Sequence, residues 1–109
     1  MKKGKRDVHS SFVALDRSIL FKCDSWKGLT PGAKLFYVYL RAKFNGGNNG
    51  QIKLHYSELK GIRGFSSNET ISRSIRELEA AGWIERTRKG GLYRFQTDFK
   101  LTGKYDGRV

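Results

Sequence analysis

An amphipathic helix in the second half of the sequence is the feature that most constrains how this chain can fold. Apolar side chains recur there at the spacing of one helix face, and charged side chains occupy the opposite face. Residues 66–69 have side chains that cap a helix N-terminus, and Gly82 is a stop signal. The sequence therefore predicts a helix over 66–81. The predicted buried face consists of Ile71, Ser74, Ile75 and Leu78, and the predicted exposed face of Glu69, Ser72, Arg73, Arg76, Glu77 and Ala80.

A second helix is predicted over 31–44. Thr30 followed by Pro31 is a start signal, because a Thr side chain caps free N–H groups and Pro is tolerated in the first turn. Apolar side chains lie on both sides of this helix, so both sides need cover. Residues 12–29, with short helical turns such as one at 24–29, are expected to provide it. The alternative is that the uncovered aromatic residues form a homodimer interface. The two sides consist of Leu35, Val38, Tyr39 and Ala42, and of Phe36, Tyr37, Leu40 and Phe44.

Short elements are predicted between these two helices. The Gly- and Asn-rich stretch at 45–50 is typical of a loop, and the alternating residues 51–54 predict one strand. His55 and Glu58 are spaced as a capping pair, so a helix of about two turns is expected to begin there. The chain is thus expected to enter helix 66–81 through a short helix and a turn.

A β-hairpin is predicted after the amphipathic helix. Residues 83–87 and 92–97 favour strands, and Gly90 and Gly91 in the connection 88–91 permit the tight turn between them. Residues 86–94 contain cations and no acid, so we expect these cations to be available to an anionic partner. They are Arg86, Arg88, Lys89 and Arg94.

The charge of the chain narrows its partners. Its 109 residues include 22 Lys and Arg against 10 Asp and Glu, which gives a formal net charge of +12. Such an excess favours a polyanionic partner, either nucleic acid or an acidic membrane face. A composition that is 38% hydrophobic can still bury a core. We expect a flexible basic arm at 1–11, one folded domain at 12–97 and a polar tail at 98–109.

Several classes of protein are not expected from this sequence. No apolar run approaches the ~20 residues that a membrane span needs, and the basic start is not followed by the apolar stretch of a secretion signal, so a cytoplasmic protein without membrane contact is expected. Cys23 is the single cysteine, and His9 and His55 lie far apart in the sequence. Because no metal-binding or nucleophile-base motif is present, we expect no enzyme, catalytic residue, metal or cofactor.

The predicted order of elements is helix, strand, short helix, turn, amphipathic helix and hairpin. The short helix contains Tyr56-Ser57-Glu58-Leu59, and the amphipathic helix contains the run from Ser67 to Leu78. The run from Ala81 to Arg86 leads into the hairpin. In these residues the chain from about Leu29 to Thr97 resembles a winged helix-turn-helix DNA-binding domain. Residues 29–34 and 99–104 are also similar to small helix-turn-helix proteins of bacterial phage and plasmid-like elements. The resemblance implies an α+β fold with a three-helix core, a small antiparallel sheet and a β-hairpin wing.

The resemblance also implies a mode of binding, in which helix 66–81 enters the major groove of DNA and the wing at 86–94 lies on the backbone or an adjacent minor groove. Arg73 and Arg76 suit base edges, since Arg reads guanine through two hydrogen bonds. The short polar side chains at the helix start suit a phosphate. Two acids, Glu69 and Glu77, flank the arginines and are expected to hold them or reject wrong sequences. The predicted DNA-binding residues are Ser66, Ser67, Asn68, Ser72, Arg73, Arg76, Arg86, Arg88, Lys89 and Arg94.

Three functions fit this sequence. The first is sequence-specific binding of double-stranded DNA by a small transcriptional regulator. The second is recognition of an origin by a replication or partition protein of a phage or plasmid-like element, through the same domain. The third is a protein-interaction module in which the basic face is incidental. The order of residues does not choose between the first two, because both need the same DNA-binding surface.

Overall fold

The structure is a computed structural model that describes residues 13–88, 97–107 and 109, with only the backbone described at Arg88. These residues form five helices and a three-stranded antiparallel sheet, which confirms the α+β class. None of the helices in this described part is long and apolar enough to cross a membrane. In chain order the elements are α2 (Arg17–Lys22), α3 (Asp24–Lys27), α4 (Pro31–Lys43), β1 (Ile52–Lys53), α5 (Tyr56–Leu59), α6 (Asn68–Ala80), β2 (Ile84–Arg88) and β3 (Asp98–Leu101).

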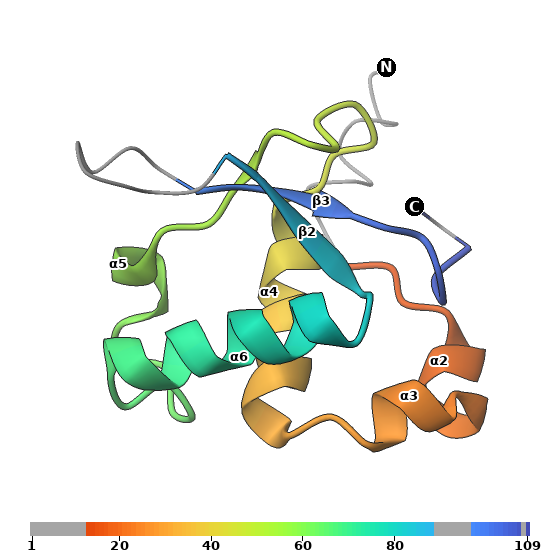
Figure 1. Ribbon diagram of the computed structural model, residues 1–109, viewed down its shortest axis with the longest axis horizontal. Coiled ribbons are helices and arrows are strands. Elements are labelled where there is room, and N and C mark those ends of the chain that lie inside the picture. The colour runs from red at the N-terminus through yellow and green to blue at the C-terminus, as the bar shows by residue number, and fades with distance from the viewer. Residues whose placement is uncertain (1–12, 89–96, 108) are drawn as a thin grey trace, which may run out of the picture.

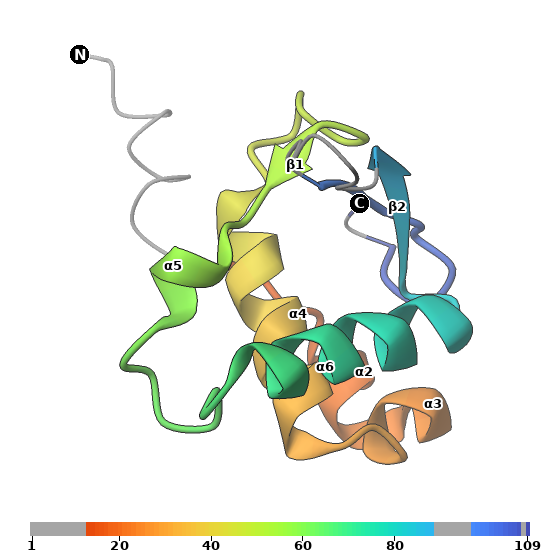
Figure 2. The ribbon, with the colours of Figure 1, turned by 60° about the vertical axis from the view of Figure 1, so that its left-hand side comes forward.

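The two longest helices cross at the centre of the molecule, as Figure 1 shows. The sheet lies over the far end of α4, and α5 lies beside the start of α6. The short helices α2 and α3 lie at one end of the molecule's longest axis, and α5 lies toward the other end. Figure 2 shows the same crossing from another side, with α6 in front of α4 and the sheet above both. One face of α6 is therefore packed against α4 while the other is turned outward.

Local signals set the ends of the long helices as the sequence predicts. The Thr30 hydroxyl accepts a hydrogen bond from the Ala33 N–H at 3.3 Å, and the Ser67 hydroxyl accepts one from the Thr70 N–H at 3.2 Å. At the end of α6, Gly82 has a φ of +88°, a conformation that favours glycine. The N–H of Trp83 then donates to the Leu78 carbonyl at 2.9 Å, as in a Schellman motif, so the chain turns directly from α6 into β2.

The crossing of α4 and α6 depends on a glycine. A Cβ added to Gly32 would lie 2.9 Å from the Ser74 hydroxyl oxygen, closer than real Cβ atoms approach. Ser74 is itself buried, and its hydroxyl donates to the Thr70 carbonyl at 3.0 Å. The buried face of α6 is the predicted one: Ile71, Ser74, Ile75 and Leu78.

Much of the apolar surface of α4 is covered within one chain. Phe36, Tyr37 and Leu40 are buried, Leu35, Val38, Tyr39 and Phe44 are half-buried, and Ala42 is exposed. Trp26 of α3 lies edge-on to Tyr37, with ring centroids 5.7 Å apart, and Phe99 of β3 lies edge-on to Phe36 at the same separation. Ile19 of α2 is also fully buried. This confirms that residues before Thr30 cover the helix. The aromatic side chains Phe36 and Tyr37, which suggested a homodimer through 31–44, are buried within the chain, so the structure does not support that interface.

The largest side chains gather around Trp83, directly after α6. Its ring lies 5.4 Å from Trp26, 5.2 Å from Tyr37 and 4.7 Å from Tyr105, measured between centroids. The Trp83 indole N–H donates to the Ser25 hydroxyl at 3.1 Å. This cluster joins α3, α4, the α6–β2 turn and the C-terminal segment, and confirms that both tryptophans are core anchors.

The sheet corrects the predicted boundary at residue 97. Its order is β1-β3-β2, so β3, which begins at Asp98, is the central strand. Phe99 pairs with Ile52 of β1 and with Arg86 of β2, and both Phe99 and Leu101 are buried. The expectation of a polar tail at 98–109 is therefore wrong for this strand. Of the predicted strand 92–97, all but Thr97 lies outside the described residues.

The C-terminal segment is also held by a buried polar cluster. Asp106 is 1% exposed, accepts a hydrogen bond from the Tyr37 hydroxyl at 2.7 Å, and lies 3.2 Å from Nε of Arg41. Burial, and then the bond to Asp106, raise the pKa of the Tyr37 hydroxyl above its ordinary value. The hydroxyl thus stays protonated and donates. The sequence pattern missed this cluster because its members lie far apart in the chain.

We predict that the Gly32→Ala variant loses about 1 kcal/mol of stability, although alanine favours a helix. The added methyl group displaces the Ser74 hydroxyl from its buried hydrogen bond. In a Ser74→Ala background no hydroxyl is displaced. There, Gly32→Ala leaves the free energy of unfolding unchanged or raises it by up to about 1 kcal/mol. Urea unfolding of the two single variants, the double variant and the parent checks the reversal. Additive effects would mean that the crossing does not depend on this contact.

Candidate functional site

The outward face of α6 presents two arginines and one acid. The side chains of Arg73 and Arg76 are 66% and 55% exposed, and that of Glu69 is 66% exposed. Both guanidinium groups approach the same oxygen, Oε2 of Glu69, at 3.8 Å from Arg73 and 3.6 Å from Arg76. These three residues recur at positions i, i+4 and i+7, so they form one row along the helix. The row is a compact charged surface opposite the buried face.

The small polar residues around this row have separate roles. Ser72 is half-buried, and its hydroxyl accepts a hydrogen bond from Nη1 of Arg76 at 3.2 Å. Ser67 caps the helix through its hydroxyl, so that group already has a partner. The Ser66 hydroxyl lies 3.4 Å from that of Thr70, and Asn68 is exposed at the first position of the helix. All three predicted phosphate-contacting residues, Ser66, Ser67 and Asn68, are exposed at the start of α6.

Glu77 does not act on the arginines, contrary to expectation. Its two carboxylate oxygens accept hydrogen bonds from the backbone N–H and the hydroxyl of Thr30, at 2.8 and 2.7 Å. Thr30 is the residue before α4, so Glu77 fixes the start of α4 against α6. Helical periodicity placed Glu77 near the exposed face, but it could not reveal a partner 47 residues away.

Arg86 is likewise engaged within the protein. Its guanidinium donates twice to Oε1 of Glu79, at 3.2 Å from Nε and 2.7 Å from Nη2, and both side chains are 29% exposed. The expectation that no acid neutralises Arg86 is therefore wrong. The reason is the turn at Gly82, which brings the end of α6 beside β2. For Arg88 only the backbone is described, and Lys89 and Arg94 lie outside the described residues.

The short helix α5 is fixed by Glu58. Its carboxylate accepts hydrogen bonds from the Lys43 ammonium group of α4 and from the His55 backbone N–H, the latter at 2.9 Å. These bonds, that from Lys43 first, hold the pKa of Glu58 below its ordinary value. The predicted capping pair is thus confirmed, although α5 is shorter than two turns.

Two cations that the sequence prediction omitted lie beside this site. Lys60 and Arg63 occupy the turn between α5 and α6, and both are exposed. Among the described residues, no ion pair involves either of them. The signal available in the sequence was their position immediately before the predicted recognition helix.

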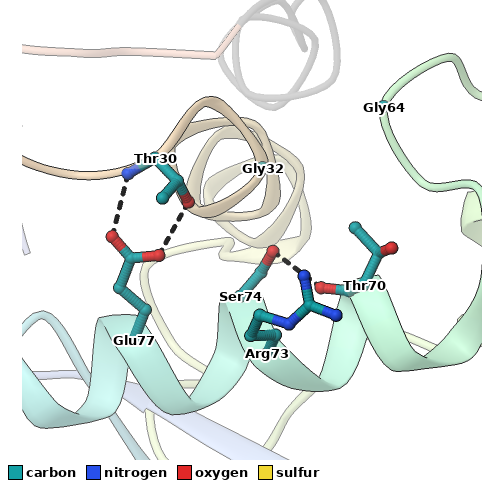
Figure 3. A pocket seen from close by; sticks show the side chains of 7 residues that line it. All are labelled: Thr30, Gly32, Gly64, Thr70, Arg73, Ser74 and Glu77. Atoms are coloured by element: carbon teal, nitrogen blue, oxygen red, sulfur yellow. Dashed lines mark hydrogen bonds between the residues drawn. The ribbon is translucent and has the colours of Figure 1, made fainter.

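A surface cavity of about 190 Å³ lies where α4 and α6 cross. Figure 3 shows Arg73 and Ser74 of α6 on one side and the start of α4 on the other, with Glu77 bound to Thr30 at one end. The volume is below the roughly 300–1,000 Å³ that is usual for a small-molecule site. The lining residues are Thr30, Gly32, Gly64, Thr70, Arg73, Ser74 and Glu77.

In the part of the chain that the structure describes, no three His, Cys, Asp or Glu side chains are grouped so that they could hold a metal ion. The exposed row on α6 therefore remains the strongest candidate site. Comparison with protein-family models, curated proteins and solved structures finds no match to this chain.

We predict that the Glu77→Ala variant unfolds more easily, by about 1–2 kcal/mol. It removes two charge-assisted hydrogen bonds to the capping residue of α4, in a setting where solvent weakens them. The Glu85→Ala variant is the control, since Glu85 is an exposed acid on β2. Thermal and urea unfolding measure both. Equal stability of the two variants would show that Glu77 does not anchor α4.

Proposed function

We propose that this protein binds double-stranded DNA sequence-specifically, with α6 as the helix that enters the major groove. The observation that carries the proposal is the row of exposed arginines on a helix whose opposite face is buried against α4. A helix held in this way presents its outer side chains at fixed positions. Such positioning is what reading base edges requires, and a mobile basic segment does not provide it.

The chemistry of the row suits the major groove. That groove is ~12 Å wide and accepts a helix, and the guanidinium group of an arginine pairs with the O6 and N7 atoms of guanine. In the part of the chain that the structure describes, Arg73 and Arg76 pair with the exposed Glu69, and Arg76 also donates to the half-buried Ser72, so their partners lie on their own helix. Exposed ion pairs contribute about 0–1 kcal/mol, so a base can replace these partners at little cost.

The arrangement of the other elements supports a winged helix-turn-helix. The chain passes from α4 through β1, α5 and α6 into β2 and β3, and α5 lies beside the start of α6. In Figure 1, β2 runs from the end of α6 back toward the side on which α5 lies. We therefore include Arg88, Lys89 and Arg94 as the wing cations of the proposal. Arg86 belongs to the protein's internal contacts and is left out.

Lys60 and Arg63 extend the proposed surface. They precede α6 directly and have no ion-pair partner among the described residues, so their charge is available to phosphates. Ser66 and Asn68 lie beside them at the start of the helix. We assign positioning on the backbone to this turn, and base reading to the row on α6.

We propose a transcriptional regulator as the biological role. A replication or partition protein of a phage or plasmid-like element would use the same surface, and the location of the bound sites, at promoters or among origin repeats, separates the two. A specific observation favours interaction with a protein as a second candidate function, because Phe21 of α2 is 69% exposed. Helix α2, which contains Phe21, lies at the end of the molecule away from the start of α6 (Figure 1), so the two functions are separable by mutation.

We predict that Arg73→Ala with Arg76→Ala sharply reduces the preference for the selected site over a scrambled one. Each lost base contact removes about 1–3 kcal/mol of discrimination. The measurement is selection from a random duplex pool by the parent protein, followed by affinities for the selected and a scrambled duplex at one salt concentration. The matched control, Lys22→Ala with Lys27→Ala, removes the same charge from α2 and α3 and keeps the preference. Phe21→Ser leaves DNA binding unchanged.

If the arginine variant lost affinity equally for selected and scrambled duplexes, α6 would not read bases. If the parent enriched no sequence, specific binding itself would be wrong. Preference for an RNA stem over the duplex at matched salt would point to RNA as the partner. Circular dichroism and urea unfolding establish that each variant is folded, which is expected because the changed side chains are exposed.

We predict a different effect for Lys60→Ala with Arg63→Ala. Phosphate contacts carry no sequence information, so affinity for selected and scrambled duplexes falls by the same factor. Losing two such contacts lowers the slope of log affinity against log salt by about 1.8. A salt titration of the variant, the Lys22/Lys27 control and the parent measures this slope. An unchanged slope would remove the turn from the interface.

A further inference from the structure

We propose that Glu69 is a specificity-determining residue of this surface, and that its carboxylate accepts a hydrogen bond from the amino group of a cytosine in the major groove. The inference rests on the proposed function and names one base that the surface reads. It follows from the position of a single acid among the cations of α6, because the acid would weaken binding to any DNA that gave it no partner.

Glu69 is distinct from the other acids of α6. Glu77 binds Thr30, and Glu79 binds Arg86, so both serve the packing of the domain. Among the described residues, the carboxylate of Glu69 instead forms ion pairs with the two exposed arginines, at 3.6 and 3.8 Å from Oε2. It occupies the first turn of α6, where the helix dipole favours a negative charge. It therefore enters any groove that Arg73 and Arg76 enter.

In this arrangement, binding of DNA by the two arginines depends on whether the sequence also offers a partner to Glu69. In the free protein the carboxylate partly neutralises both guanidinium groups, and beside a phosphate it adds repulsion. Nonspecific attraction to the backbone is thus weakened at the point where the chain is otherwise most basic. Removing water from the carboxylate costs free energy unless a hydrogen-bond donor replaces the water. Only a base that donates to the carboxylate offsets this cost.

The major groove offers few such donors. Guanine presents acceptors at O6 and N7, and thymine presents the acceptor O4 and a methyl group, so both repel or exclude a carboxylate. Adenine presents its N6 amino group next to the acceptor N7, and a carboxylate that accepts from N6 is repelled by N7. Cytosine presents the N4 amino group alone, and the guanine paired with it offers the acceptors that an arginine reads. A C·G pair therefore serves the acid and a neighbouring arginine together.

The test uses the full chain with Glu69→Gln and Glu69→Ala. Each is put through selection from the same random duplex pool as the parent, and affinities for selected and scrambled duplexes are then measured. Asp24→Asn is the matched control, because it makes the same change in net charge as Glu69→Gln at an exposed position on α3, away from the start of α6.

The parent is expected to select a cytosine at one position, with discrimination against the other bases on the order of tenfold. Glu69→Gln shifts that position toward adenine, because an amide pairs with N6 and N7 of adenine, whereas Glu69→Ala selects no base there. Both variants bind scrambled duplex more tightly than the parent does. Asp24→Asn keeps the parent's motif and its ratio of affinities.

Three results overturn the inference, and they are distinguishable. If the parent selects a motif that Glu69→Gln and Glu69→Ala also select with the same ratio of affinities, Glu69 reads no base while specific DNA binding stands. If the parent selects no motif, the proposed function fails and the inference fails with it. A motif that changes identically in Asp24→Asn would assign the effect to net charge, which also overturns the inference.

Discussion

The close crossing of α4 and α6 is the constraint on which the rest of the molecule depends. At this point Gly32 leaves room for Ser74, and Glu77 binds the backbone and hydroxyl of Thr30. The crossing therefore combines a steric requirement for the smallest residue with a directional pair of hydrogen bonds. Together they fix the rotation of α6 about its own axis. The rotation decides which residues of α6 face outward, so an internal contact determines the composition of the candidate surface.

The C-terminal end of α6 is also held by its continuation into the sheet. The turn at Gly82 places Trp83 in the aromatic cluster, and the bond between Arg86 and Glu79 ties β2 back to the helix. The C-terminal segment completes this arrangement, because β3 is the central strand and Asp106 is bound to Tyr37. A segment that looks polar in sequence thus supplies the middle of the sheet. The helix is thus held at its middle and at its C-terminal end, while Glu69, Arg73 and Arg76 on its outer face are exposed.

The features that could be predicted from the sequence are those with local signals. The caps at Thr30 and Ser67, the stop at Gly82 and the buried face of α6 each depend on residues within about a turn of one another. The location of the exposed arginines followed from the same periodicity. Such signals operate through neighbouring backbone groups and need no knowledge of tertiary structure.

The features that could not be predicted depend on partners distant in the chain. Asp106 is buried only because Tyr37 and Arg41 meet it, and Glu77 leaves the arginines only because Thr30 lies across the helix crossing. A charged residue in sequence has the same appearance whether it is solvated or paired. Counting acids in a window of the chain therefore overestimates how many cations are available, as it did for Arg86.

This distinction changes the meaning of the +12 charge. Arg41, Lys43, Lys53 and Arg86 form ion pairs that join elements of the fold, so their charges act mainly within the protein. Lys60 and Arg63 have no such partner in the described part of the chain, and Arg73 and Arg76 share one exposed acid. Long-range attraction depends on the summed charge and on its distribution over the surface, whereas discrimination between sequences depends on the few groups held in fixed positions. Among the acids of α6, Glu79 holds Arg86 within the fold, whereas Glu69 pairs with Arg73 and Arg76 on the exposed face. The proposed specificity of this surface therefore involves a negative residue as well as positive ones.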